Sequence, residues 1–163
     1  MPLNVPQQLF LRQARSDYDI FKYLVYRGPC HRLHYLQMCT EKLAKVYAWR
    51  NGTPPGRSHR HFVLFLEALE YRPDFHEMFG YRRGGSLSFL KPLIFDLARR
   101  IEALAPAGNN GANPEYPWPP NSPTYSPVTE PFQEWIDWNE TAAGRRLHIF
   151  IETLLNDYDH FLP

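Results

Sequence analysis

Proline is distributed very unevenly along this chain, and that distribution limits the possible folds more than any other feature. Of the 16 prolines, eight lie within residues 106–131. Each proline removes a backbone hydrogen-bond donor and fixes its own φ angle, so neither a helix nor an interior strand tolerates this density. We therefore expect an ordered connection here, anchored to the rest of the domain by Tyr116, Trp118 and Tyr125.

Outside that segment, apolar residues recur with the period of an α-helix. In residues 6–26 they follow one face at spacings of three or four, as Phe10, Ala14, Tyr18, Phe21 and Val25. We expect this first helix to end at Gly28-Pro29, because glycine permits a helix-ending conformation and proline lacks the donor that continuation needs.

A second helix is expected over residues 30–50, where Asn51-Gly52 would stop it. Its apolar stripe consists of Leu36, Cys39, Leu43 and Val46. Because the turn between the first two helices is short, they should pack antiparallel.

Three further helices are expected from the same period. They run from about Ser58 to an interruption at Arg72-Pro73, from Ser86 or Ser88 to about Leu104, and from about Thr141 to Phe161, with short helical turns at 74–79 and 132–138. Pro92 should fall in the first turns of its helix, since elsewhere it would break a backbone hydrogen bond. No segment alternates with the period of a strand. The sequence predicts one all-α domain over residues 1–163, an up-and-down bundle of about five helices.

The charge balance and cysteine content exclude several classes of protein. The chain has 18 Lys and Arg against 17 Asp and Glu, so bulk charge provides no attraction to nucleic acid or an acidic membrane. Two cysteines are too few for a disulfide framework or a four-thiolate zinc site. The N-terminus lacks the pattern of a signal peptide, and no apolar run approaches the ~18 residues of a membrane helix. We expect a soluble, cytoplasmic protein without a cofactor or membrane contact.

The densest polar stretch lies in the second expected helix. His34, Gln37, Glu41 and Lys45 are spaced by three, four and four positions, which places them on one helical face. Such a face is either a solvated stripe or one wall of a groove that grips a polar ligand. The spacing alone does not decide between them.

A metal site between the first two helices is a further alternative. Asp17, His31 and His34 could contribute ligands, but such a site needs three convergent groups and usually a histidine pair four apart on another helix. The remaining histidines offer no such pair, so no metal is expected.

Two segments resemble HEPN domains. Residues 34–47, HYLQMCTEKLAKVY, resemble the second helix of that family, in which a glutamine, a Glu-Lys pair and a further lysine follow one another. Residues 97–104, LARRIEAL, and the downstream EYPWP at 115–119 are similar to its late helix and trailing Tyr-Pro segment. The order and lengths of the expected helices also agree with the family from about residue 8 to 160.

The resemblance implies a small helical bundle that commonly forms homodimers. Many HEPN domains are metal-independent ribonucleases, whereas others are ligand-binding modules or non-catalytic partners of minimal nucleotidyltransferases. The nucleases carry an arginine and, after a short spacer, a histidine near the start of a late helix. These residues would stabilise the phosphate charge and handle the 2′-hydroxyl proton. Arg27 and His34 alone satisfy the spacing, but they flank Gly28-Pro29 and lie at the second helix.

We therefore expect a non-catalytic HEPN-like module that binds a nucleotide, RNA or protein partner. A metal-independent, toxin-like ribonuclease using Arg27 and His34 is the alternative. A structural subunit of a nucleotidyltransferase or toxin–antitoxin assembly is the third possibility. The expected ligand groove is lined by Asp17, His31, His34, Gln37, Glu41, Lys45, Arg99 and Arg100.

Overall fold

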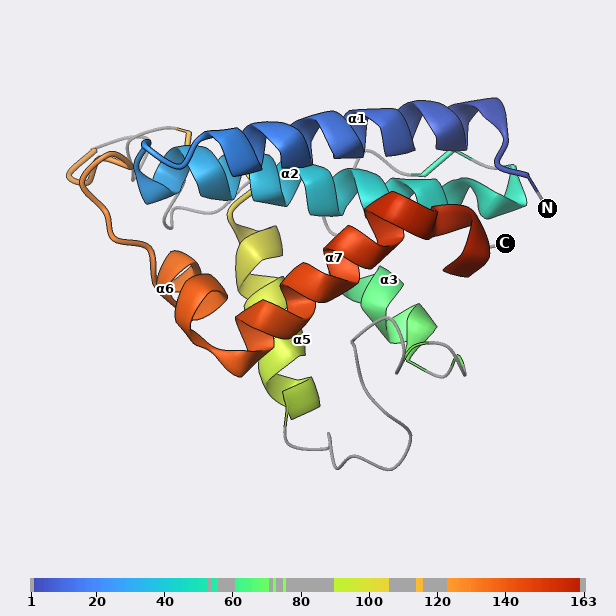
Figure 1. Ribbon diagram of the computed structural model, residues 1–163. Helices are drawn as coiled ribbons and strands as arrows, with labels where there is room; N and C mark the ends of the chain where they lie inside the picture. Colours follow the sequence, from blue (N-terminus) through green and yellow to red (C-terminus); the bar gives the residue numbers. More distant parts are fainter. Residues whose placement is uncertain are drawn as a thin grey trace.

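The protein is described by a computed structural model that covers residues 2–52, 54–55, 61–70, 72, 75, 90–105, 114–115 and 123–161. Across these residues the regular structure is helical and no β-strand occurs. In chain order the elements are α1 (Val5–Tyr23), α2 (Pro29–Ala48), η1 (Trp49–Asn51), α3 (Phe62–Leu69), α5 (Leu90–Ala103), α6 (Gln133–Glu140) and α7 (Ala142–Phe161) (Figure 1). The all-α prediction is confirmed.

Some sequence expectations fall outside these ranges. They concern the caps Ser58, Ser86 and Ser88, all of the turn at 74–79 except Phe75, and the anchors Tyr116 and Trp118.

The start of α1 is fixed by reciprocal capping. Asn4 Oδ1 accepts a hydrogen bond from the backbone N–H of Gln7 at 3.0 Å, and Gln7 Oε1 accepts one from the backbone N–H of Asn4 at 3.0 Å. This capping box satisfies donors that the first helical turn leaves without a partner.

The end of α1 differs from the prediction. The helix stops at Tyr23, so Val25 lies beyond it and is exposed. Gly28 and Pro29 do not end α1; they begin α2, with Gly28 as its N-cap and Pro29 in its first turn. Proline is favoured there because its missing N–H would have no helical partner anyway.

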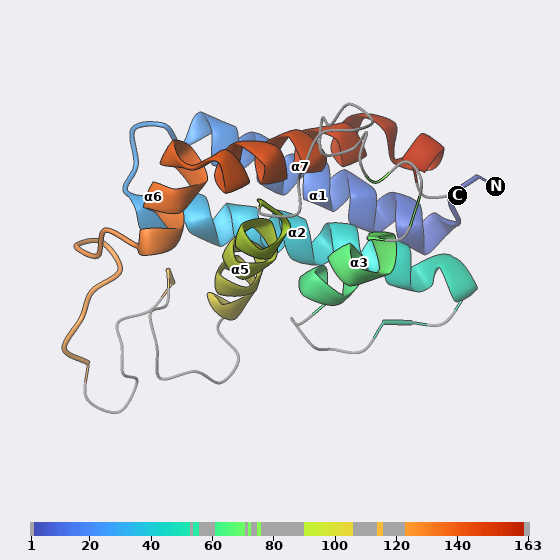
Figure 2. The ribbon, with the colours of Figure 1, turned by 90° about the horizontal axis from the view of Figure 1, so that it is seen from below.

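α1 and α2 lie side by side and antiparallel (Figures 1 and 2). Gln7 Nε2, near the start of α1, donates to Val46 O in the last turn of α2 at 3.0 Å. At the other end, Arg32 Nε of α2 donates to Phe21 O at 3.1 Å. The Arg32 side chain thereby satisfies a carbonyl that the last turn of α1 leaves without a helical partner. The predicted antiparallel pairing is confirmed.

The predicted stop of the second helix is also confirmed. After η1, Gly52 adopts a φ of 72° and donates its N–H to Trp49 O at 3.0 Å. Glycine reaches this left-handed conformation without the steric penalty that a side chain brings.

The core lies between the α1–α2 pair and the helices α3, α5 and α7. In Figures 1 and 2, α7 runs obliquely past the pair and α5 crosses it steeply. Each fully buried large apolar side chain contributes ~1.5–3 kcal/mol relative to exposure. The predicted stripe of the second helix is buried, and so are residues at helical spacing on the later helices: Leu36, Cys39, Leu43, Val46, Phe62, Phe65, Leu66, Leu69, Leu90, Ile94, Leu97, Ile101, Leu147, Ile151, Leu154 and Tyr158.

A close approach joins α6 to α7. A Cβ on Gly144 would lie 2.2 Å from Trp138 O, so only glycine fits there. The Trp138 ring stacks on His148 with centroids 5.5 Å apart and meets Phe21 edge-on at 5.8 Å. This packing holds the N-terminal half of α7 against the end of α1.

The last part of the proline-rich connection lies at the α1–α2 turn. Val128 O is 4.0 Å from the position of a Cβ on Gly28, and both ribbon views place the segment at this end of the molecule. Tyr125, one of the expected anchors, is 57% exposed, whereas Phe132, just after the connection, is buried.

Candidate binding sites

The polar residues predicted to share one face of the second helix lie buried or half-buried along α2. Asp17 Oδ2 of α1 lies 2.7 Å from Lys42 Nζ of α2, and Glu41 Oε1 pairs with Lys45 Nζ one turn along α2. Gln37 Nε2 donates to Glu41 Oε2 at 3.3 Å. We call these five residues, Asp17, Gln37, Glu41, Lys42 and Lys45, the polar seam.

The polar seam is buried and electrically balanced. Asp17, Gln37 and Glu41 are 4%, 2% and 5% exposed, and two carboxylates face two ammonium groups. Such balance is required because an unpaired charge is very costly to bury. The predicted shared face is confirmed by the Gln37–Glu41–Lys45 contacts. The expected open groove is wrong for Asp17, Gln37 and Glu41, because all three side chains are buried.

The two histidines at the start of α2 have different surroundings. His34 Nδ1 lies 2.7 Å from Glu115 Oε1, and each side chain is about one quarter exposed. The His34 ring also meets Tyr35 edge-on, with centroids 5.0 Å apart. His31 is exposed. Within the described residues, neither histidine makes a hydrogen bond or ion pair with the polar seam.

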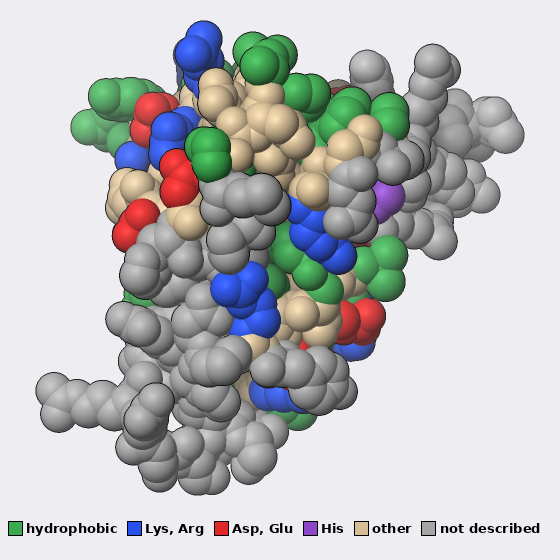
Figure 3. Space-filling view, turned by 90° about the vertical axis from the view of Figure 1, so that its right-hand side faces the viewer, with side chains coloured by type: hydrophobic (Ala, Val, Ile, Leu, Met, Phe, Trp, Pro, Cys, Tyr) green, Lys and Arg blue, Asp and Glu red, His purple; other side chains and the backbone are tan. Residues whose placement is uncertain are grey.

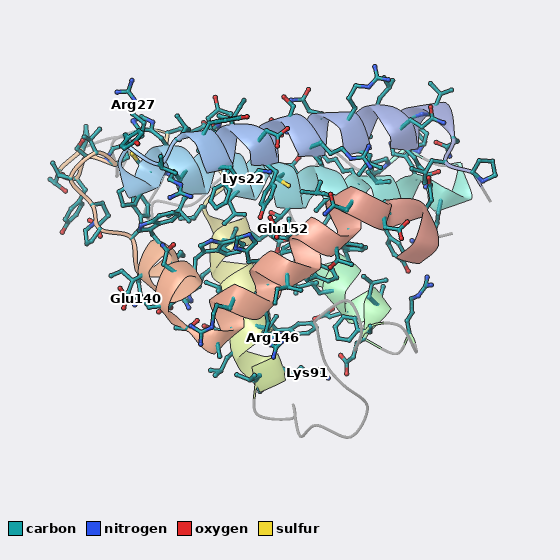
Figure 4. All side chains as sticks on the ribbon, in the orientation of Figure 1. Lys22, Arg27, Lys91, Glu140, Arg146 and Glu152 are labelled. Carbon is teal, nitrogen blue, oxygen red and sulfur yellow. The ribbon has the colours of Figure 1, made fainter. Side chains whose placement is uncertain are left out.

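Arg27 does not combine with His34 into a catalytic pair. Its exposed side chain points away from the body of the protein at the α1–α2 turn (Figure 4). His34 faces Glu115 instead, and the described structure contains no hydrogen bond between the arginine and this histidine. The spacing in the sequence therefore does not bring the two groups onto one reacting atom.

Arg100 faces α6 rather than the polar seam. Its Nη2 lies 2.5 Å from Asp137 Oδ2 and its Nε lies 3.0 Å from Asp96 Oδ2. Partial burial alone would lower the pKa of Arg100, but hydrogen bonds and charge from these two carboxylates outweigh it and raise the pKa.

Arg99 faces α3. Its Nη2 lies 4.0 Å from Glu67 Oε1, and its guanidinium lies 6.0 Å from the centroid of the Phe95 ring. The expectation that Arg99 and Arg100 complete a groove with α2 is corrected, because their contacts direct them to α3 and α6.

A pocket that the sequence did not reveal lies between α1 and α7. It has a volume of about 230 Å³, and we call it the α1–α7 pocket. Figure 4 shows two of its charged residues, Lys22 and Glu152, on the two helices. The lining residues are Arg15, Tyr18, Asp19, Lys22, Glu152, Leu155 and Asn156.

The buried wall of this pocket is Tyr18. The residue is 2% exposed, and in the described part of the chain its hydroxyl has no partner of hydrogen-bond geometry. Burial raises the pKa of this phenol, and the nearby Glu152 carboxylate raises it further. The helical period correctly placed Tyr18 in the apolar stripe of α1 but carried no signal of a polar pocket beside it.

A second candidate surface lies at the α1–α2 turn. Large side chains are unusually exposed there, with Tyr26 at 97% and Tyr23 at 83%. We call this surface the tyrosine end; it consists of Tyr23, Val25, Tyr26 and the exposed Arg27, with the backbone of Val128 close to the turn.

Comparisons with known proteins found no relative of this chain. No protein-family model, curated protein or solved structure matches the chain. Among the residues that the structure describes, no group of three or more His, Cys, Asp or Glu side chains could hold a metal ion. None of the described helices combines the length and apolar character needed to cross a lipid bilayer.

Proposed function

We propose that the chain is a non-catalytic, HEPN-like helical module that binds a protein partner through the tyrosine end. The observation that carries this proposal is the exposure of Tyr23 and Tyr26, at 83% and 97%, beside Arg27. Tyrosine and arginine are the side chains most enriched, with tryptophan, among residues that dominate protein–protein binding energy.

The shape of the tyrosine end supports a role in contact with another molecule. The α1–α2 turn and residues 123–130 come together there, since Val128 O lies 4.0 Å from a Cβ position on Gly28. A tyrosine buries ~150–250 Å² when it is covered. Tyr23 and Tyr26 therefore offer a partner a large contact area with few side chains to order.

Charge favours a protein over RNA at this surface. The formal charge of the chain is +1, and RNA-binding surfaces depend on many cations along the phosphate backbone. Figure 3 shows the opposite end of the molecule, where acidic and basic side chains both occur among the residues described. Val25, which lies between Tyr23 and Tyr26 in the sequence, is also exposed and suits an apolar protein contact.

The test begins with affinity capture on the full chain, followed by reconstitution with the purified partner. The double variant Tyr23→Ala/Tyr26→Ala should weaken the measured affinity by at least about 30-fold, the loss of ~2 kcal/mol typical of a hot spot. Leu9→Ala and Leu64→Ala are matched controls, because both leucines are exposed on other parts of the helical surface. Each control should bind the partner like the unaltered chain.

Three outcomes would overturn this assignment. A partner that binds the double variant as tightly as the unaltered chain would exclude the tyrosine end. RNA oligomers that bind through Tyr23 and Tyr26 would make the partner a nucleic acid. A homodimer that dissociates on the double substitution, seen by light scattering, would make the partner a second copy of this chain.

A further inference from the structure

An exposed cation, the guanidinium of Arg15, lines the α1–α7 pocket. Arg15 Nε donates to Leu155 O at 2.8 Å, and within the described residues no acidic side chain pairs with this guanidinium. The Leu155 contact lies just before Asp157, where the backbone of α7 departs from helical geometry. That departure disturbs the helical hydrogen-bonding pattern nearby, and Leu155 O accepts from Arg15. The contact holds the guanidinium at the pocket while its terminal nitrogens remain available.

The opposite wall carries a partly exposed carboxylate. Glu152 Oε1 lies 3.3 Å from His148 Nε2, and the Glu152 side chain is 46% exposed, so it remains open to a ligand. Arg15 and Glu152 belong to facing helices and line the same pocket. In the described structure, Arg15 and Glu152 form no ion pair with each other.

Tyr18 provides a hydrogen-bonding group between these two charges. The residue is 2% exposed. Its hydroxyl lies near the Glu152 carboxylate, and its pKa is raised by burial and then by the charge and hydrogen bonding of Glu152. No contact of full hydrogen-bond geometry is made to this hydroxyl among the residues described. A buried hydroxyl without a partner is uncommon and points to a ligand or water that completes it. Because burial raises the pKa of Tyr18, the phenol keeps its proton at neutral pH and can donate it in a hydrogen bond.

The remaining lining residues limit the ligand to small and polar molecules. A volume of about 230 Å³ is below the ~300–1,000 Å³ of pockets for drug-sized molecules, yet it exceeds the ~30 Å³ that one water occupies in the liquid. Asp19 and Lys22, joined at 3.1 Å, together with Asn156 give the walls further polar groups.

We propose that the α1–α7 pocket binds a small zwitterion of the free α-amino acid class. The ligand carboxylate would lie against Arg15 and accept from the Tyr18 hydroxyl, and its ammonium group would lie against Glu152. Such a ligand bridges two opposite charges that the protein leaves apart. This site is distinct from the tyrosine end and does not depend on the proposed function.

The proposal is tested by NMR titration of the full-length chain with glycine, alanine, serine and glutamine in turn. N-acetylalanine, which lacks the ammonium group, and alaninamide, which lacks the carboxylate, are the matched ligand controls. Inorganic phosphate tests for a simple anion site. We expect saturable shifts near residues 15–22 and 152–156 with at least one free amino acid, with a Kd of about 1 mM, and none with the three controls.

Substitutions in the protein provide an independent arm. Arg15→Gln and Glu152→Gln should each weaken binding at least about tenfold, the loss of ~1.4 kcal/mol expected for one charge-assisted contact. Arg12→Gln and Glu140→Gln, which change exposed residues outside the lining, should leave binding unchanged. Equal binding of N-acetylalanine, alaninamide or phosphate would overturn the proposal. So would the absence of saturable shifts with all four amino acids at about 20 mM, twenty times the expected Kd.

Discussion

His34 Nδ1 on α2 lies 2.7 Å from Glu115 Oε1 in the proline-rich connection. This contact joins a segment of low helical propensity to the polar end of the longest helix pair. It also gives His34 a structural partner, where the sequence offered a ligand-binding or catalytic role. Pro114, the neighbour of Glu115, is buried as well, so the connection meets the body of the protein at this point.

The His34–Glu115 contact should contribute modestly to stability. A double-mutant cycle with His34→Ala and Glu115→Ala should give a coupling energy of about 0.5–1 kcal/mol, since partly exposed ion pairs fall in that range. Urea unfolding of the four proteins measures it. Strict additivity of the two single effects would show that the pair contributes nothing.

The polar seam should respond very differently to single and paired substitutions. Asp17→Leu alone leaves the Lys42 ammonium without its carboxylate, and removal of one partner from a buried pair costs about 3–5 kcal/mol. The combined Asp17→Leu/Lys42→Met protein should recover most of that loss, because no buried charge remains unpaired. Chemical denaturation decides this. A double variant as unstable as Asp17→Leu would contradict the assignment of these two charges to one pair.

Two buried tyrosines should give opposite results when each loses its hydroxyl. Tyr18→Phe removes a hydroxyl without a partner of hydrogen-bond geometry in the described residues and should raise the free energy of unfolding by about 0.5–1 kcal/mol. Tyr158→Phe removes the 3.2 Å hydrogen bond to Leu43 O and should lower it by about 1 kcal/mol. Thermal melts in the absence of ligand measure both. A clear loss of stability in Tyr18→Phe would mean that its hydroxyl is already satisfied.

Asp137 should make part of the stability dependent on acid pH. Partial burial alone would raise its pKa, but hydrogen bonds from Gln133 and Arg100, and the charge of Arg100, hold the pKa below the ordinary value of 3.8. A group whose pKa is lower in the folded state than in the unfolded state stabilises the protein at pH values above its unfolded-state pKa. This stabilisation is lost as the pH falls through the folded-state pKa.

Asp137→Asn should therefore lower stability near neutral pH, and its difference from the unaltered chain should shrink as the pH falls below about 4. Unfolding measured across that range gives the answer. In an Arg100→Gln background the same substitution should show a weaker pH dependence, because one cause of the lowered pKa has been removed. A difference independent of pH would refute the argument.

The ribonuclease alternative stays a prediction from the sequence, and the geometry around Arg27 and His34 gives it no support. We expect no cleavage of RNA oligomers by the purified chain in the presence of EDTA, even at high protein concentration. Cleavage that His34→Ala abolishes would restore the catalytic interpretation and reject a non-catalytic module.

The helices could be predicted because their burial is encoded locally. Leu36, Leu43, Leu147 and Leu154 all lie on apolar stripes of helical period, and all are buried. The end of α1 was harder to predict from the sequence, because Gly28-Pro29 suits either the end of one helix or the start of the next. The competing roles of these residues differ by only small energies.

The sites were much harder to predict than the helices. Spacing identifies which residues share a face, as it did for Gln37, Glu41 and Lys45, but does not identify what packs against that face. The α1–α7 pocket combines Tyr18 with Glu152, residues 134 positions apart in the sequence. Only the packing of α7 against α1 creates it.

The central claim is that the polar residues of α2 hold the fold while a protein partner is contacted at the tyrosine end. NMR mapping of the full chain with its purified partner tests this most directly. The account predicts that the largest shift changes fall on residues 22–28, with little change at residues 34–45. Changes concentrated on residues 34–45, with residues 22–28 unaffected, would contradict it.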